Sequence, residues 1–195
     1  MTFYQGQSLA DAVREATAVL SDAGVPSPRV DAELLAEHLL GGGLGRLRAM
    51  MLGDTPAPDG YRELVEERAG RVPLQHITGV AYFRHLALRV GPGVFIPRPE
   101  TQSGVQVVID HLAGMPKAKV VEPGTGSGAI AGSIAHEVPG AEVHAVEYST
   151  FAHAWAARNL EPLGVVLIEG DLRVVLPVHN GTFDVVVSNP PYIPA

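Results

Sequence analysis

The residues with the most specific chemistry stand near the end of the sequence, where Ser188-Asn189-Pro190-Pro191-Tyr192 follows an apolar run. Two consecutive prolines fix the backbone and cannot donate hydrogen bonds, so the Pro190 carbonyl and the Asn189 side-chain oxygen form a rigid pair of acceptors. Such a pair suits a planar NH2 group, and Tyr192 can stack on that group and exclude water. The motif predicts a site for an amide or aryl amine; the alternative is a structural strand exit.

The chemistry explains why such a site is needed. An amide or aryl amino nitrogen has a delocalised lone pair and is a poor nucleophile toward a sulfonium methyl group. Acceptors on both N–H bonds return electron density to the nitrogen and stabilise the positive charge that grows during in-line transfer. The motif therefore indicates group transfer to nitrogen, and the sequence contains no residue that must serve as a general base.

A glycine-rich loop, Glu122-Pro123-Gly124-Thr125-Gly126-Ser127-Gly128, follows a predicted strand and opens a predicted helix over 129–137. Its glycines let the backbone approach a ligand at a helix N-terminus, which suits a nucleotide-like cofactor. The pattern fits a dinucleotide fold as well as a methyl donor, and a tight structural turn is a third interpretation. The candidate cofactor-binding residues of this loop are Gly124, Thr125, Gly126, Ser127 and Gly128.

Two carboxylates follow later strands. Glu147 ends the second predicted strand, where it can accept hydrogen bonds from two ribose hydroxyls. Asp171, after Gly170 at the end of the third strand, can accept from an adenine amino group, with Leu172 packed on the ring. The alternative for Glu147 is a solvated strand end, and the alternative for Asp171 is a simple turn.

Short apolar strands that alternate with helices must position these residues, which predicts an α/β fold. The strands are expected near 118–122, 142–147, 165–169 and 183–188, and a helix is expected from about 100 to His111. We expect residues 1–70 to form a helical bundle, with helices that begin after Ser8, at Pro28 and near Pro58 and with Gly41 to Gly43 closing the second. Residues 71–98 are expected to form a β-hairpin linker, and residues 99–195 a partial Rossmann-like sheet.

Composition excludes several classes of protein. The chain has no cysteine and its histidines lack paired spacing, so we expect no disulfide and no metal site. The formal net charge is −7 and lysine occurs only at 117 and 119, which argues against direct binding of nucleic acid. Neither a membrane span nor a signal peptide is expected, which favours the cytoplasm.

Together these motifs make the chain similar to the bacterial release factor N5-glutamine methyltransferases, the HemK or PrmC family, over essentially all of its length. The resemblance rests on the glycine loop, on Asn189 to Tyr192, and on three further segments: residues 27–35, 73–79 and 95–101. It implies a class I methyltransferase that uses S-adenosyl-L-methionine to methylate the glutamine of the Gly-Gly-Gln motif in class I peptide release factors. The helical domain would bind the release factor.

The resemblance also assigns residues. It implies cofactor contacts by Gly124 to Gly128, Glu147, Leu172 and Asn189, and a glutamine amide received by Asn189 to Tyr192. Beside that pocket it would place the substrate-binding residues Phe95, Arg98 and Glu100, although a surface charge and a first-turn carboxylate explain the last two equally well. The chain departs from the family pattern at Glu122-Pro123, Gln102 and Gly132.

The end of the sequence is a further departure, since family members continue through three more strands. A sheet ordered 3-2-1-4 would then expose its fourth strand as an edge, so we expect a fragment or a degenerate member. Three other functions remain open at this point: amino-group methylation of adenine or cytosine, a non-catalytic remnant that binds a partner, and a nicotinamide dehydrogenase.

Overall fold

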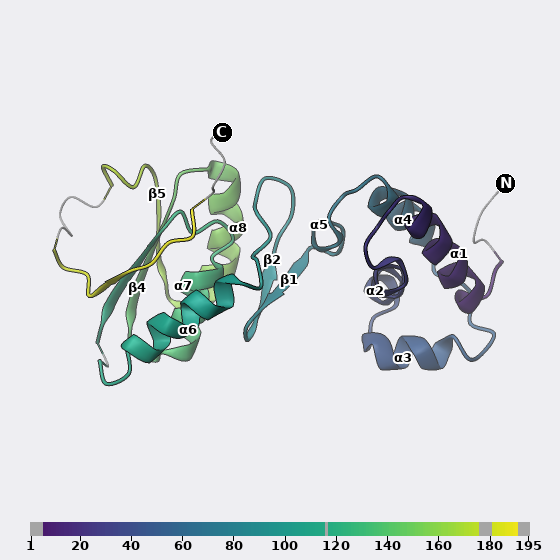
Figure 1. Cartoon of the computed structure of the whole chain (residues 1–195), viewed down its shortest axis with the longest axis horizontal. Coiled ribbons are helices and arrows are strands. Elements are labelled where there is room, and N and C mark those ends of the chain that lie inside the picture. Colours follow the sequence, from purple (N-terminus) through teal and green to yellow (C-terminus); the bar gives the residue numbers. More distant parts are fainter. Residues whose placement is uncertain (1–5, 116, 176–180, 191–195) are drawn as a thin grey trace. The chain divides into compact units, whose positions relative to one another are not determined.

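The computed structural model describes residues 6–115, 117–175 and 181–190. The chain divides into two compact units, Met1–Thr78 and Gly79–Ala195 (Figure 1). The first consists of helices and the second is an α/β unit. No helix in the described part of the chain is long and apolar enough to cross a membrane.

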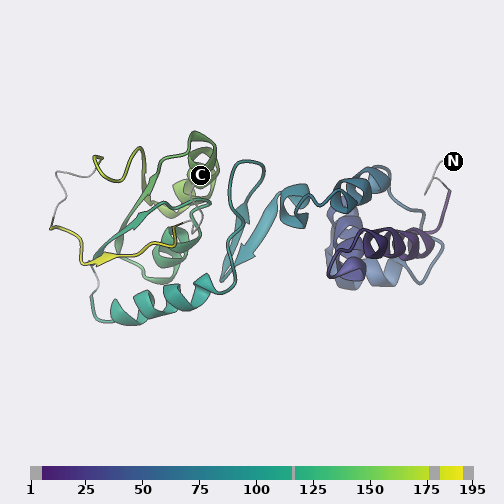
Figure 2. The same cartoon turned by 45° about the horizontal axis from the view of Figure 1, so that its top comes forward.

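The first unit is a helical bundle around its own apolar core, and Figure 2 shows its helices gathered around one another. Ser8 caps the first helix as expected, with its Oγ accepting from the Asp11 N–H at 3.2 Å. Leu20, Leu35, Leu47 and Tyr61 are fully or almost fully buried between the helices. The helices are α1 (Leu9–Asp22), α2 (Pro28–Leu40), α3 (Gly43–Met50), α4 (Tyr61–Ala69) and α5 (Leu74–Thr78).

Helices α3 and α5 were not expected from the sequence. Gly41 ends α2, and Gly43 begins α3 two residues later. Helix α3 is stabilised by Leu47, which is buried in the bundle, and by Arg48, which donates to Glu33 at 2.8 Å. These tertiary interactions outweigh the low helix propensity of glycine. The helix expected near Pro58 begins at Tyr61 instead, since Gly60 has a left-handed conformation and acts as the N-cap.

The second unit combines a hairpin with a parallel sheet. Strands β1 (Val80–Phe83) and β2 (Leu86–Arg89) pair antiparallel, and α6 follows at Thr101–His111. The sheet has the order β5-β4-β3-β6, which is the expected 3-2-1-4 arrangement. Its elements are β3 (Lys119–Pro123), α7 (Ala129–Glu137), β4 (Glu142–Glu147), α8 (Thr150–Leu160), the 3-10 helix η1 (Glu161–Leu163), β5 (Val166–Glu169) and β6 (Val185–Val186).

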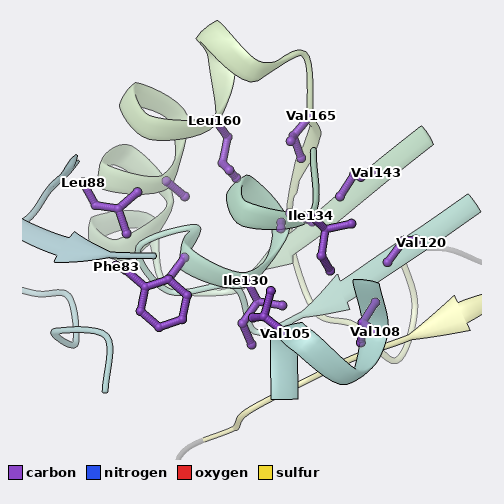
Figure 3. Packing of buried hydrophobic residues seen from close by; sticks show 14 of the residues in the cluster. Phe83, Leu88, Val105, Val108, Val120, Ile130, Ile134, Val143, Leu160 and Val165 are labelled. Atoms are coloured by element: carbon purple, nitrogen blue, oxygen red, sulfur yellow. The ribbon is translucent and has the colours of Figure 1, made fainter. Parts of the chain in front are cut away.

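One apolar core joins the hairpin, the helices and the sheet. Figure 3 shows side chains of β1, β2, α6, α7 and α8 meeting those of β3 and β4. Strand β6 is shorter than the expected 183–188, but the N–H groups of Asp184 and Val187 extend its pairing with β3 at 2.8 and 3.0 Å. The carboxyl ends of β3, β4 and β6 therefore lie at one edge of the sheet, where open α/β sheets bind ligands.

Candidate active site

The glycine loop is fastened to the neighbouring strand by its backbone. The N–H groups of Gly124 and Thr125 both donate to the Val146 carbonyl, at 2.8 and 3.0 Å. The next N–H, that of Gly126, donates to Glu147 Oε2 at 2.8 Å. Three successive amides therefore hold the loop against the end of β4.

The loop glycines have positive φ angles of 69° at Gly124, 59° at Gly126 and 85° at Gly128. A Cβ at Gly124 or Gly126 would meet no atom within 4 Å, whereas one at Gly128 would lie 2.8 Å from Leu160 Cγ. One part of the loop thus leaves space for a ligand to approach the backbone, and the other packs tightly on α8.

Glu122 anchors the loop to the first turn of α7. Its side chain is buried, and its Oε2 accepts from Thr125 Oγ1 at 2.5 Å and from the Ala131 N–H at 2.8 Å. Burial raises the pKa of Glu122 to about 8, with a further contribution from the Glu147 charge and opposition from both hydrogen bonds. From the sequence, Glu122 was expected only to depart from the family pattern, and its role as an anchor of the loop was not predicted.

Glu147 stands between the loop and α8. Its Oε2 accepts from Gly126, its Oε1 accepts from the Ser149 N–H at 2.9 Å, and the residue is buried. Each carboxylate oxygen carries a second lone pair that can accept from a ligand hydroxyl.

Asp171 reaches the same edge of the sheet through Gly170, whose N–H donates to the Glu147 carbonyl at 2.9 Å. The carboxylate of Asp171 accepts from the backbone N–H and the guanidinium of Arg173, which lowers its pKa to about 2. Leu172 exposes 56% of its surface and offers an apolar face to a ligand. Arg173, which the sequence analysis did not consider, thus competes for the expected adenine acceptor.

Asn189 is held at the end of β6 by groups from two distant segments. Its Nδ2 donates to Thr101 Oγ1 at 2.9 Å, and the hydroxyl of the preceding Ser188 donates to the Pro123 carbonyl at 2.7 Å. Pro190 is exposed. The expected substrate residues Pro191 and Tyr192 lie outside the described residues.

The bond to Thr101 brings the segment that contains Phe95, Arg98 and Glu100 to the same edge of the sheet. All three residues are exposed, and the Arg98 carbonyl accepts from the Thr101 N–H at 3.1 Å, which starts α6. Thr101 itself was not among the expected site residues, because its partner is 88 positions away.

Trp155 and Phe151 of α8 form a clamp on the turn at residues 91–93, which precedes this segment. This clamp was not expected from the sequence. Trp155 Nε1 donates to the Pro92 carbonyl at 3.1 Å, and the Arg158 guanidinium lies 4.8 Å from the centre of the Trp155 ring. Side chains at Gly91 and Gly93 would collide with Trp155 and Phe151. The clamp therefore requires glycine on both sides of Pro92.

Most of the expected site residues are thus near one another in the fold. Backbone and side-chain bonds join the glycine loop to Glu147, Glu147 to the Asp171 turn, and the end of β3 to the Asn189 segment. The described residues contain no group of three or more His, Asp or Glu side chains that could hold a metal ion.

Comparison with known proteins agrees with this arrangement. The PrmC N-terminal domain matches residues 11–79, and the methyltransferase small domain matches residues 85–194. A release factor glutamine methyltransferase of Streptomyces coelicolor is 52% identical over 184 residues, which cover 93% of this chain and 65% of that protein. The enzyme of the same name from Corynebacterium glutamicum is 47% identical over 192 residues, which cover 96% of this chain and 68% of the relative.

The chain therefore spans about two thirds of the length of these relatives. The similarity extends through both units, and the methyltransferase match covers more than half of the sequence. The resemblance expected from the motifs is confirmed, and the chain belongs to the release factor glutamine methyltransferase family.

Proposed function

We propose that this chain transfers a methyl group from S-adenosyl-L-methionine to the side-chain amide nitrogen of the glutamine in the Gly-Gly-Gln motif of class I peptide release factors. The observation that carries the proposal is the hydrogen bond of 2.7 Å from Ser188 Oγ to the Pro123 carbonyl. Because Ser188 makes this bond, the next residue, Asn189, lies beside the strand end from which the glycine loop emerges, which supports its assignment as the amide acceptor. The names of the relatives supply the class of substrate.

The cofactor side of the site fits S-adenosylmethionine. The space beside Gly124 and Gly126, which a Cβ would fill, admits a ligand against the loop backbone. The second lone pairs of the Glu147 oxygens are the acceptors for two ribose hydroxyls. Leu172 would cover one face of the adenine, and Asp171 would accept from its amino group while it retains its bonds to Arg173.

The acceptor side would hold the glutamine amide. S-adenosylmethionine, when bound, supplies a methyl group activated on a sulfonium sulfur. Asn189 Oδ1 and the Pro190 carbonyl would each accept one N–H of the glutamine amide, which returns electron density to its nitrogen and stabilises the charge that develops there. The transfer would need no general base among the described residues, because the amide proton would pass to water.

Further residues complete the proposed pocket. We assign Pro191 to the rigid backbone and Tyr192 to stacking on the amide plane, as the sequence predicts. Phe95 is 80% exposed although it is large and apolar, and it would cover the substrate glutamine. Arg98 and Glu100 would contact the release factor backbone or side chains around that glutamine.

Three segments of the chain would have separate roles. We assign residues 1–70 to release factor recognition, residues 71–98 to a linking segment and residues 99–195 to methyl transfer. The acidic balance of the chain, with a formal net charge of −7, favours a protein substrate over nucleic acid. We expect this activity in the cytoplasm, because the proposed substrate belongs to the translation machinery.

The test is transfer of a labelled methyl group to a purified class I release factor. A matched substrate has the Gly-Gly-Gln glutamine replaced by alanine, and single-stranded DNA serves as a second control. The proposal predicts label on the release factor, none on the glutamine-free substrate and none on DNA. Label on DNA, or equal label on both protein substrates, would contradict it.

A further inference from the structure

We propose that Thr101 is a positioning residue, which orients the Asn189 amide so that its oxygen faces the substrate glutamine. The inference rests on the proposed function and adds to it the residue that restrains the Asn189 side chain. Its basis is the hydrogen bond of 2.9 Å between Asn189 Nδ2 and Thr101 Oγ1, which joins the end of β6 to the first residue of α6.

The orientation matters because the two ends of an asparagine amide have opposite character. Its NH2 end donates two hydrogen bonds and its oxygen accepts. The terminal torsion of asparagine is broad, so the side chain by itself does not hold one orientation. A threonine hydroxyl can accept or donate, so its bond restrains this torsion, and in the structure it accepts from Nδ2. With Nδ2 directed at Thr101, Oδ1 is at the opposite end of the planar group. The reverse orientation would present N–H groups to the N–H groups of the substrate amide, which is repulsive.

Thr101 can act in this way because the start of α6 is itself held in place. Arg84 NH1 donates to the Gln102 carbonyl at 3.2 Å, and Arg84 Nε donates to Glu137 Oε1 at 2.6 Å. Glu137 is the last residue of α7, the helix that begins at the glycine loop. The backbone that carries Thr101 is therefore held against α7.

The backbone of the acceptor segment has a separate support. The hydroxyl of Ser188 donates to the Pro123 carbonyl, so loss of the Thr101 bond leaves the end of β6 attached to β3. The proposal consequently concerns the amide orientation and not the position of the strand. Valine replaces threonine with nearly the same shape and without the hydroxyl, whereas serine keeps the hydroxyl.

The first experiment compares Thr101→Val, Thr101→Ser and the control Ser103→Ala, an exposed hydroxyl in the same helical turn. Methyl transfer to the release factor is measured with cofactor affinity from calorimetry. We expect Thr101→Val to lower kcat about 10- to 100-fold. KM and cofactor affinity should stay within about threefold, and Thr101→Ser and Ser103→Ala should behave like the wild type. Unchanged kcat in Thr101→Val, or no recovery with serine, overturns the proposal.

A second measurement separates this proposal from the proposed function. If the wild-type chain transfers no methyl group, the proposed activity fails, and the orientation is then judged by NMR of the Asn189 side-chain NH2 protons. The proposal predicts that these resonances shift and exchange faster with water in Thr101→Val, and return to the wild-type positions in Thr101→Ser. Identical resonances in all three proteins contradict it.

Discussion

The two sides of the candidate site are built from different parts of the polypeptide. The cofactor side, at the ends of β3 and β4, is held by backbone N–H groups of Gly124, Thr125 and Gly126. The acceptor side, at the end of β6, is held by the side chains of Ser188 and Asn189. Binding of the cofactor should therefore depend mainly on loop geometry, whereas transfer should depend on single functional groups.

Asn189→Ala separates the two sides most sharply. It removes one of the two amide acceptors and leaves the loop intact, so we expect kcat to fall about 10²- to 10³-fold. Cofactor affinity, measured by calorimetry, should remain within about threefold of the wild type. Transfer at the wild-type rate would show that Asn189 is not an acceptor.

Gly128→Ala tests the cofactor side against its matched control, Gly124→Ala. Both glycines have positive φ, but only at position 128 would the new Cβ meet Leu160. We expect Gly128→Ala to lower the free energy of unfolding by about 2–5 kcal/mol, the sum of backbone strain and overpacking.

In Gly124→Ala we expect a loss of about 1–2 kcal/mol, from the backbone alone, together with weaker cofactor binding. Urea unfolding measures the stability of both variants and calorimetry their affinity for the cofactor. Equal destabilisation of the two variants would mean that the contact of the new Cβ with Leu160 adds nothing to the loss of stability at position 128.

Glu122 makes the stability of the cofactor side depend on pH. Because its pKa is raised from 4.5 to about 8 in the folded chain, the unfolded chain releases this proton first as the pH rises. The stability that the neutral group contributes is fully present below pH 4.5 and is lost progressively as the pH approaches 8.

Glu122→Gln should therefore flatten the fall in unfolding free energy between pH 5 and about 8. Urea unfolding at several pH values measures both slopes. The same slope in wild type and variant would mean that Glu122 is ionised in the folded protein.

The smallest effect is expected at the Asp171 turn. The ion pair of Asp171 with Arg173 is exposed, so Arg173→Ala should leave the unfolding midpoint nearly unchanged. Cofactor affinity should change by less than about threefold, because the Asp171 carboxylate remains. A loss of affinity above about tenfold would identify the arginine, not the aspartate, as the residue that contacts the ligand.

Local patterns predicted the elements of the α/β unit well. The strands, the loop and the helix that begins at Ala129 follow from apolar runs separated by glycines. The order of the sheet was expected only from the resemblance to the family. The pairing of Thr101 with Asn189 and the burial of Glu122 depend on contacts that no local pattern contains. In the helical unit, α3 was missed since its glycine-rich start reads as a helix end, and α5 has only five residues.

The most direct test of the central claim is calorimetric titration of the chain with S-adenosylmethionine, with Glu147→Gln as the matched variant. The substituted amide can no longer accept from the N–H groups of both Gly126 and Ser149. We predict one site of roughly micromolar affinity in the wild type, weakened about tenfold or more in the variant. Absence of binding by a chain that circular dichroism shows to be folded would contradict the account.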